Sequence, residues 1–399
     1  MRKVVLYIGS IFLPDKSAGA QRALSLSKSF RDLGYKVVLV GMSEKGKLKK
    51  DILKTKGICE GFDTYSVKKP TSMKDWVHHT VSISEFIAVI NYYGVENIYS
   101  IVAMEYEAIA LYRLVKYCKK HGIELMVDAE EWYGPSQLHF PMNIAKNFDT
   151  FLRMRWVYRR KVENMICISR FFYNFYKMDI INRVYIPGCV DLSQQKWKEI
   201  PPYRPNINLT FGYAGNPGNN FEKERLDWLI QCISELNFEG YSCCLIVAGV
   251  GEKFLMEKLG RQSINWKAIC ILGTLSHSDC LKVISKCDFS VIVREDKRVT
   301  KAGFPTKLSE SFGCCTPVIS TPSSNISEYI IDGKTGFLCD GFSKQSVKEM
   351  LKYVISNVST EQIIDMHRYL NRCNPLFYKN FTADLEFFLK KVGVKNHEI

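Results

Sequence analysis

Short apolar runs alternate along the chain with longer stretches in which apolar residues recur at helical spacing. Residues 4–8 form the first apolar run, and residues 24–33 repeat apolar positions with the period of a helix. Further apolar runs occupy positions 37–40, 97–102, 125–127, 166–169, 209–214, 245–250, 269–273, 289–293 and 318–320. Strands that alternate with helices in this way form parallel sheets, so the pattern predicts an α/β fold.

A proline-rich stretch interrupts this alternation near the middle of the chain. Pro201, Pro202 and Pro205 make a stiff linker there. A chain of 399 residues with 46% hydrophobic composition can bury two sizeable cores. We therefore expect a first domain over residues 1–200 and a second domain that begins at residue 201.

The formal net charge of +14 indicates an anionic partner: nucleic acid, a membrane surface or a phosphorylated substrate. Charge alone does not choose among these partners. The sequence has neither a helix-turn-helix pattern nor an aromatic RNA-binding signature, so we expect no nucleic acid.

The 14 cysteines are scattered, and no CxxC pair or Cys/His cluster has the spacing of a metal site. We expect reduced thiols, no bound metal and a cytoplasmic location. The first 20 residues superficially resemble a signal peptide, but residues 4–8 are better explained as the strand on which the next helix packs. No apolar run reaches the roughly 18 residues of a membrane-spanning helix.

A loop followed by a helix start lies at residues 301–310. Pro305 suits the first helical position, and the free backbone N–H groups of that turn face the preceding loop. Lys301 and Lys307 add positive charge, which predicts a site for an anion such as a diphosphate, and Glu310 can accept hydrogen bonds from sugar hydroxyls. An ordinary amphipathic helix with a solvated Lys and Glu is the alternative. The candidate donor-binding residues here are Gly303, Phe304, Pro305, Thr306, Lys307, Leu308 and Glu310.

Together with residues 316–319 and 328–338, this stretch resembles the donor-site signature of glycosyltransferase family 4. The resemblance implies a GT-B fold, in which two Rossmann-like domains face each other, and metal-independent, retaining transfer of sugar from a nucleotide donor without a further cofactor. The family pattern is Glu-x7-Glu, whose second Glu binds the ribose and whose first Glu touches the donor sugar. Glu310 takes the second position and Ala302 the first, so one sugar contact is absent. The resemblance also divides the rest of the chain into a nucleotide-sugar domain, 201–375, and a last helical segment, 376–399, that packs back on the first domain.

The resemblance assigns further roles at the start of the second domain. Gly215 and Asn216 form a turn after its first strand. Lys223 matches the family Lys that holds the diphosphate, and Arg225 replaces the Arg that usually stands at the position of Asn216. We expect Lys223 and Arg225 to act on the leaving diphosphate and Arg294 to face the donor. A charged helix start without this role is the alternative.

Two features of the first domain are candidates for chemistry. Gly19 begins a helix that faces the strand ends, where open parallel sheets bind ligands. The resemblance implies that this loop binds beside the donor phosphates and the acceptor, although an ordinary turn explains a lone Gly at least as well. Asp128, Glu130 and Glu131 follow one strand, and Glu105 follows a neighbouring strand. Glu130 stands closest to a family His that packs against the donor sugar, so it is our catalytic candidate. A solvated capping loop is the alternative.

Residues 151–165 show a helical pattern with an apolar and a basic face. The apolar face comprises Phe151, Met154, Tyr158, Val162 and Met165, and the remainder carries Arg153, Arg155, Trp156, Arg159, Arg160 and Lys161. A surface helix would explain the pattern, but a basic helix with an interfacial Trp can also rest on anionic lipid. With the resemblance, this charge predicts a lipid-linked acceptor in bacterial surface-polysaccharide synthesis, such as lipopolysaccharide or capsule. The enzyme would then sit at the inner face of the plasma membrane, and lysines 45–56 are the next candidates for the contact.

Two other functions fit the same fold. A nucleotide-sugar epimerase would need its own carboxylates around the sugar and no membrane contact. A non-catalytic protein that binds nucleotide sugars or polyanions is compatible with Ala302 in place of Glu.

Overall fold

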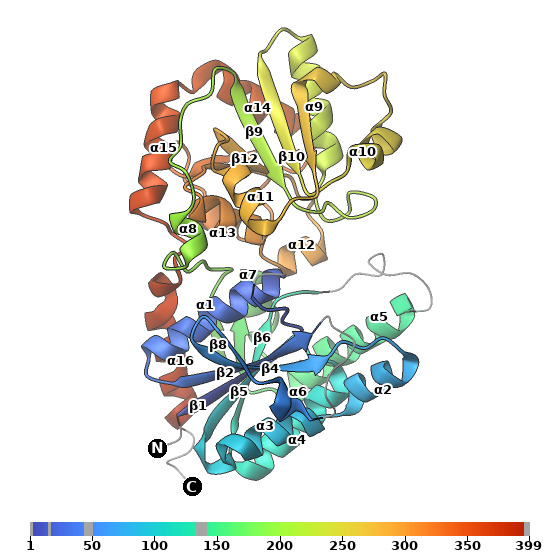
Figure 1. The fold of residues 1–399 in the computed structure, drawn as a ribbon, viewed down its shortest axis with the longest axis vertical. Coiled ribbons are helices and arrows are strands. Elements are labelled where there is room, and N and C mark those ends of the chain that lie inside the picture. Colours follow the sequence, from blue (N-terminus) through green and yellow to red (C-terminus); the bar gives the residue numbers. More distant parts are fainter. Residues whose placement is uncertain (1–2, 15–16, 44–50, 133–141, 395–399) are drawn as a thin grey trace. The chain divides into compact units, whose positions relative to one another are not determined.

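The computed structural model describes residues 3–14, 17–43, 51–132 and 142–394, and it divides into two compact units (Figure 1). The first unit contains the chain up to Cys189 and again from Tyr378. The second unit runs from Val190 to Phe377. The chain therefore leaves the first unit shortly before the proline-rich stretch and returns to it for the last helix. Of the lysine-rich residues 45–56, positions 45–50 lie outside the described part.

An eight-stranded sheet forms the centre of the first unit. Its strand order is β3-β4-β2-β1-β5-β6-β7-β8, and neighbouring strands are parallel except that β3 runs antiparallel to β4. The central strands are buried along nearly their whole length, as expected of strands that are apolar on both faces. The strands are β1 (Val4–Gly9), β2 (Lys36–Ser43), β3 (Gly57–Cys59), β4 (Phe62–Lys68), β5 (Ile98–Met104), β6 (Glu124–Ala129), β7 (Asn164–Cys167) and β8 (Asn182–Tyr185).

Helices lie on both sides of this sheet (Figure 1). The last of them, α16, packs against α1 and β8, and the Tyr378 hydroxyl just before it donates to the Asp32 carboxylate at 2.8 Å. The helices are α1 (Ala18–Asp32), α2 (Met73–Val81), α3 (Ser84–Tyr93), α4 (Ala108–His121), α5 (Met142–Leu152), α6 (Tyr158–Lys161), α7 (Arg170–Phe175) and α16 (Thr382–Val394).

The second unit is a six-stranded parallel sheet with the order β11-β10-β9-β12-β13-β14. Its strands are β9 (Leu209–Ala214), β10 (Cys243–Ala248), β11 (Ile269–Gly273), β12 (Phe289–Ile292), β13 (Val318–Ser320) and β14 (Gly336–Leu338). Its helices are α8 (Gln195–Lys198), α9 (Leu226–Phe238), α10 (Glu252–Leu259), α11 (His277–Ile284), α12 (Arg298–Ala302), α13 (Thr306–Gly313), α14 (Lys344–Asn357) and α15 (Thr360–Arg372). The strand–helix alternation predicted from the apolar runs is thus present in both units.

Each sheet reverses its strand order at one point. In the first unit, β2 lies on one side of β1 and β5 on the other; in the second unit, β10 and β12 flank β9 in the same way. Open parallel sheets bind ligands beyond the carboxyl ends of the strands at such a reversal, because the loops there diverge and leave a crevice. The fold therefore places candidate sites after β1 and β5, and after β9 and β12.

The segment 151–165 differs from the single amphipathic helix predicted for it. Helix α5 ends at Leu152, and a π-helical turn, Arg153–Val157, separates it from α6. A π-turn accommodates an extra residue, so it rotates the faces that precede and follow it relative to each other. Phe151, predicted to be buried, is consequently 60% exposed, whereas Arg153, predicted to be solvated, is fully buried beside Glu105 at 3.2 Å. The burial of Met154, Tyr158, Val162 and Met165 is confirmed.

A buried ion pair ties α1 to the centre of the first sheet. Two guanidinium nitrogens of Arg22 donate to Asp128 at 2.6–3.0 Å, and a third donates to the carbonyl oxygens of Ile186 and Pro187 at 2.9 Å. The Tyr7 hydroxyl also donates to Asp128. Both charged side chains are almost fully buried, so each one depends on the other for the stabilisation that water would otherwise provide.

Replacing Arg22 with Met should lower the free energy of unfolding by about 3–5 kcal/mol, because it leaves the Asp128 carboxylate buried without its counter-ion. Urea unfolding measures the loss. Lys120→Met, at an exposed cation on α4, is the control and should stay within about 0.5 kcal/mol of the wild type. The double variant R22M/D128N should recover part of the loss, and equal stability of R22M and K120M would contradict the role assigned to the pair.

Candidate functional site

The strand reversal of the second unit brings Gly215 and Lys307 into direct contact. Gly215 follows β9 with φ of +132°, a conformation that favours glycine. A Cβ atom at this position would lie 2.5 Å from Lys307 Cε and 2.9 Å from its Nζ. The absence of a side chain at Gly215 therefore lets the Lys307 side chain lie on the backbone at the end of β9.

Lys307, in the first turn of α13, is held by a carboxylate and an aromatic ring. Its Nζ forms an ion pair with Glu224, and it lies 4.0 Å from the ring centroid of Tyr213. Burial lowers the pKa of Lys307 below its ordinary value, while the Glu224 carboxylate acts in the opposite direction. The result is a cation kept at the sheet's carboxyl edge by an acidic partner, next to the free N–H groups of a helix start.

Two further predicted residues lie around Lys307. Arg294, just beyond β12, and Glu310, one helical turn after Lys307, are both close enough for their charges to act on the Lys307 ammonium. Glu310 Oε1 lies 2.9 Å from His277 Nε2 at the start of α11. The backbone of Arg294 is fixed on both sides by the Thr321 hydroxyl, which accepts from its N–H at 2.9 Å and donates to its carbonyl at 2.7 Å.

The loop before α13 is shaped by packing. Phe304 and Leu308 are buried, and the Phe304 ring packs edge-on against Tyr329. Pro305 occupies the N-cap of α13, and Thr306 is its first residue. The side chain of Ala302, which takes the place of the family's first Glu, is fully buried and presents no group to a ligand. Gly303, Phe304 and Leu308 can therefore serve a ligand only through their backbone and by positioning the helix start.

The two cations assigned to the leaving diphosphate lie in different settings. Arg225 binds Asp227 at 2.6 Å and Glu295 at 3.3 Å, and its guanidinium lies 3.9 Å from the Trp228 ring centroid. Lys223 is exposed, and its backbone N–H donates to Pro217. Asn216 uses its side chain to close its own turn by accepting from the Gly218 N–H at 2.8 Å. The cation that the structure brings against Gly215 is Lys307, which follows Lys223 by more than eighty positions.

Sequence reasoning missed Glu224, Tyr213 and His277. Glu224 stands among alternating charges, so nothing local distinguishes it from a solvated residue. Tyr213 lies inside an apolar strand, and His277 follows the Ser276 N-cap of α11 like any residue of a first turn. The signal that could have found them is pairing across the fold, with Lys307 for the first two and with Glu310 for His277.

In the first unit, the corresponding edge holds Gly19 and Glu130 side by side. A Cβ atom at Gly19 would lie 3.4 Å from Glu130 Oε2, and Glu130 Oε1 lies 3.1 Å from Arg22 Nε. Burial raises the pKa of Glu130, the nearby carboxylates of Asp128 and Glu105 raise it further, and Arg22 opposes them. A raised pKa favours the protonated form of Glu130, which can donate a hydrogen bond.

Glu105 positions the loop that carries Glu130. Its backbone has φ of +51°, an uncommon conformation for a residue with a side chain. Its Oε1 accepts from the N–H groups of Glu130 at 3.3 Å and Glu131 at 2.9 Å, and Arg153 compensates its charge. The structure thus brings Glu105, which follows β5, next to the residues that follow β6.

Within the described residues, no group of three or more His, Cys, Asp or Glu side chains could hold a metal ion. The cysteines in this part of the chain are free thiols. No helix among the described segments is long and apolar enough to span a membrane.

Comparison with known proteins links the chain to glycosyltransferases. The family described as Glycosyl transferases group 1 matches residues 204–368. A curated relative, an uncharacterized glycosyltransferase of Methanocaldococcus jannaschii, is 24% identical over 197 residues. That match covers 49% of this chain and 50% of the relative, so the chain spans about half the length of the relative it matches.

Solved glycosyltransferase structures share the fold over nearly the whole chain. Sucrose-phosphate synthase from Thermosynechococcus elongatus has a TM-score of 0.69 at 10% identity, covering 99% of this chain and 100% of its own. The catalytic domain of Arabidopsis thaliana starch synthase IV has a TM-score of 0.67 at 9% identity, with 98% and 99% covered. Anabaena HepE, solved with UDP, has a TM-score of 0.62 at 13% identity, with 98% and 100% covered. These similarities confirm the predicted GT-B fold, and the family match lies within its second unit.

Proposed function

We propose that the protein is a retaining, metal-independent glycosyltransferase that takes a nucleotide sugar at the carboxyl edge of the second sheet. The observation that carries the proposal is Lys307, buried against Gly215 at the strand reversal and at the start of α13. The group 1 match over the same unit supports this assignment, as does the UDP in the structure of HepE, a protein of the same fold.

The side chains at this edge suit the parts of a nucleotide sugar. The diphosphate would lie at the N–H groups of the α13 start, with Lys307 and Arg294 as its cations and Glu310 accepting from the ribose hydroxyls. When the bond from the anomeric carbon to the diphosphate breaks, negative charge grows on the leaving oxygen. Positive groups fixed in advance around that oxygen stabilise the transition state. An acceptor hydroxyl forms the new bond to the anomeric carbon and gives up its proton, and we expect no cofactor besides these two substrates.

We place the acceptor on the first unit, at the edge formed by Gly19 and Glu130. A protonated Glu130 can donate a hydrogen bond to an oxygen of the acceptor there, and Arg22 and Glu105 keep it in place. We further propose a lipid-linked glycan acceptor, in bacterial surface-polysaccharide synthesis at the inner face of the plasma membrane. The net charge of +14 supports an anionic surface as partner.

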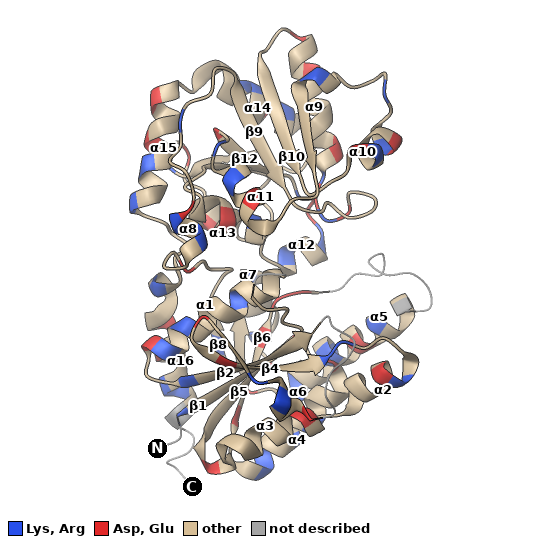
Figure 2. Ribbon diagram, viewed as in Figure 1, with Lys and Arg blue, Asp and Glu red and all other residues tan. Residues whose placement is uncertain are grey.

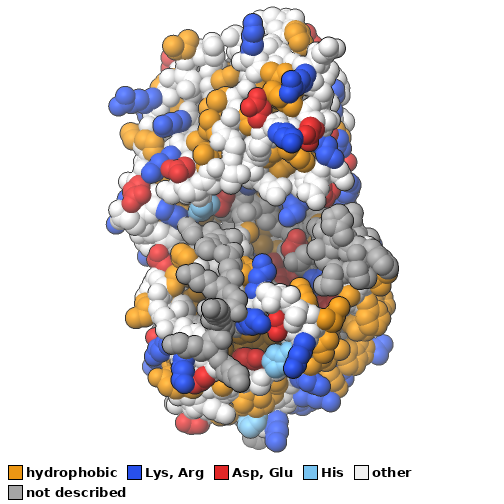
Figure 3. All heavy atoms as spheres, turned by 45° about the vertical axis from the view of Figure 1, so that its right-hand side comes forward, with side chains coloured by type: hydrophobic (Ala, Val, Ile, Leu, Met, Phe, Trp, Pro, Cys, Tyr) orange, Lys and Arg blue, Asp and Glu red, His pale blue; other side chains and the backbone are white. Residues whose placement is uncertain are grey.

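The membrane contact proposed here differs from the basic patch expected from sequence. Arg153 is buried and cannot reach lipid, and Lys and Arg are spread over both units (Figure 2). Helix α5 instead exposes Ile144, Phe148 and Phe151, which recur at helical spacing and are each at least 60% exposed. Figure 3 brings this side of the first unit forward, and hydrophobic side chains gather on it. An exposed apolar stripe with cations nearby, such as Arg155 and Lys161, is typical of a helix that lies in a bilayer surface.

A test of the proposed activity is incubation with UDP-, GDP- and dTDP-sugars, with and without membranes. Transfer or slow hydrolysis of one donor is expected, and Lys307→Met should lower that rate about 100- to 1000-fold, the usual cost of losing one preorganised charge at a leaving group. Epimer formation would favour an epimerase. Binding without turnover would favour the non-catalytic alternative, which the buried Ala302 allows.

Two variants control for the effect of Lys307→Met on folding. Lys334→Met changes an exposed cation of the same unit and should leave the rate unchanged. K307M/E224Q removes both members of the ion pair and should fold while remaining inactive. Wild-type turnover in either variant that lacks Lys307 would refute its role.

Replacing Glu310 with Gln should raise the KM for the nucleotide sugar and lower kcat/KM about 10- to 150-fold, the worth of hydrogen bonds to one charged group. Steady-state kinetics with the active donor measures both constants. Glu349→Gln, at an exposed carboxylate on α14, is the matched control. If Glu310→Gln keeps wild-type constants while folded, Glu310 does not bind the ribose.

Replacing Phe148 and Phe151 with Ser should weaken binding to anionic vesicles by about tenfold or more per residue, because each Phe contributes roughly 1.5–3 kcal/mol when buried in the bilayer interface. Vesicle sedimentation measures the partition coefficient. Phe387→Ser, at a Phe of similar exposure on α16, should leave binding unchanged. Equal loss in both variants, or none in either, would remove α5 as the contact.

A further inference from the structure

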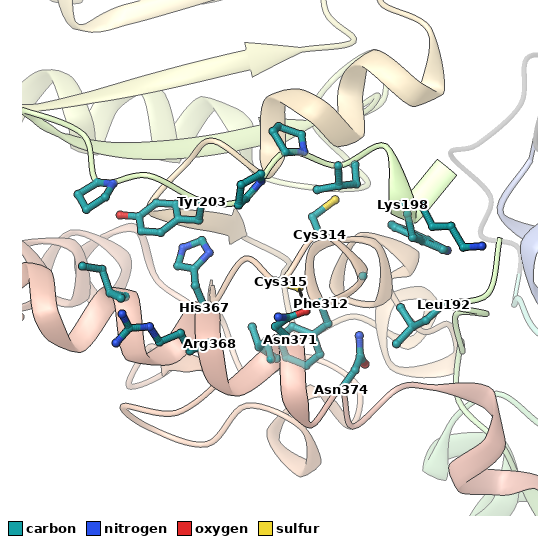
Figure 4. A pocket seen from close by; sticks show the side chains of 18 residues that line it. Leu192, Lys198, Tyr203, Phe312, Cys314, Cys315, His367, Arg368, Asn371 and Asn374 are labelled. Carbon is teal, nitrogen blue, oxygen red and sulfur yellow. Dashed lines mark hydrogen bonds between the residues drawn. The ribbon is translucent and has the colours of Figure 1, made fainter. Parts of the chain in front are cut away.

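A cavity lies in the second unit, away from the part of α13 that carries Lys307 and Glu310. It has a volume of 740 Å³ and lies between the segment 192–205, the last residues of α13 and the second half of α15 (Figure 4). Its volume falls within the range of about 300–1,000 Å³ of small-molecule sites. Because Lys307 begins α13 and the cavity borders its other end, the two sites are distinct.

The charges around the cavity exclude two classes of ligand. Of the described residues that line it, none is Asp or Glu, so a metal ion or an amine would find no counter-charge. The carboxyl ends of α13 and α15 both border the cavity, and helix carboxyl ends carry partial negative charge that disfavours a phosphate. The cations Lys198 and Arg368 lie on opposite sides in Figure 4, and Arg368 already pairs with Asp365 at 3.2 Å. A neutral, polar ligand fits best.

His367 offers a buried acceptor. Its side chain is 4% exposed, its ring stacks on Tyr203 at 3.6 Å, and its Nε2 lies 3.2 Å from the Asp288 carbonyl oxygen. Because a carbonyl can only accept, Nε2 carries the hydrogen and Nδ1 keeps its lone pair. Burial lowers the pKa of His367 to about 4, so the ring is neutral at pH 7. Nδ1 has no hydrogen-bond partner within the described part of the chain.

Trp197 offers a buried donor on the wall formed by the 192–205 segment. Its Nε1 has no hydrogen-bond partner among the described residues. Its ring lies so close to Gly313 that a Cβ atom there would be 2.6 Å from Trp197 Cζ3. The last residue of α13 is thus a glycine, unfavourable in a helix, where this ring needs the space. Asn371 adds an amide whose Oδ1 lies 3.7 Å from Cys315 Sγ.

We propose that this cavity binds a neutral carbohydrate. Sugar hydroxyls both donate and accept, so they can pair with a donor such as Trp197, an acceptor such as His367 or the Asn371 amide. The C–H face of a sugar ring can pack on the aromatic and proline walls formed by Tyr203 and Pro202. The proposal rests on the lining of this cavity and is independent of the nucleotide-sugar site.

Saturation-transfer NMR with the full chain tests the proposal. The probes are the methyl glycosides of glucose, galactose, mannose and N-acetylglucosamine, together with maltotriose, at millimolar concentration. Each spectrum is recorded with and without excess UDP, which occupies the proposed donor site. We expect transfer to at least one of these sugars. The proposal would be overturned if no sugar showed saturation transfer, or if saturation transfer appeared only in the absence of UDP.

A pair of neighbouring substitutions locates the binding. Asn371→Trp places a large side chain in the cavity and should abolish saturation transfer. Arg372→Trp adds the same side chain at an exposed position that does not line the cavity, so saturation transfer should be preserved. Trp197→Phe should weaken binding about 2- to 12-fold, the worth of one hydrogen bond. Unchanged transfer in Asn371→Trp would show that the sugar binds elsewhere.

Discussion

A charge inside a protein is costly unless an opposite charge is buried with it, and this constraint shapes the strand ends of both units. Arg22 forms an ion pair with Asp128, Arg153 with Glu105 and Lys307 with Glu224. In each pair the partners come from distant parts of the sequence. These pairs fix the loops at the carboxyl edges of both sheets, where the fold leaves space for ligands.

The pair in the second unit has a direct bearing on anion binding. Lys307 is held close to Gly215 by a carboxylate that carries the same kind of charge as a diphosphate. An incoming anion would therefore exchange one negative partner for another rather than meet an isolated ammonium. The ammonium is already largely removed from water, so much of the desolvation cost of a buried ion pair has been met during folding. In the first unit, burial and the neighbouring Asp128 carboxylate raise the pKa of Glu130, and Arg22, which also pairs with Asp128, offsets only part of this effect.

The sequence predicted the fold well because apolar runs and helical periods are local. The central strands of both sheets follow from their apolar runs, and the GT-B architecture follows from resemblance. The strands β3, β4, β8 and β14 were not predicted, because they are short or mix polar and apolar residues. The π-turn at Arg153–Val157 could not be predicted, since one extra residue leaves no mark in the composition but turns Phe151 outward and Arg153 inward. The pairing of Lys307 with Glu224 was missed for another reason. The two residues are 83 positions apart, so the sequence favoured Lys223 and Arg225, the cations that follow Gly215 most closely in the chain.

The last helix gives the chain an unusual order of assembly. Residues 190–377 form a continuous unit, whereas the first unit is complete only when α16 (Thr382–Val394) has been added to α1 and β8. During synthesis the ribosome releases the chain from its amino end. The second unit can consequently finish folding while the first still exposes the apolar surface that α16 will cover, so the part of the protein made first is the part that is finished last.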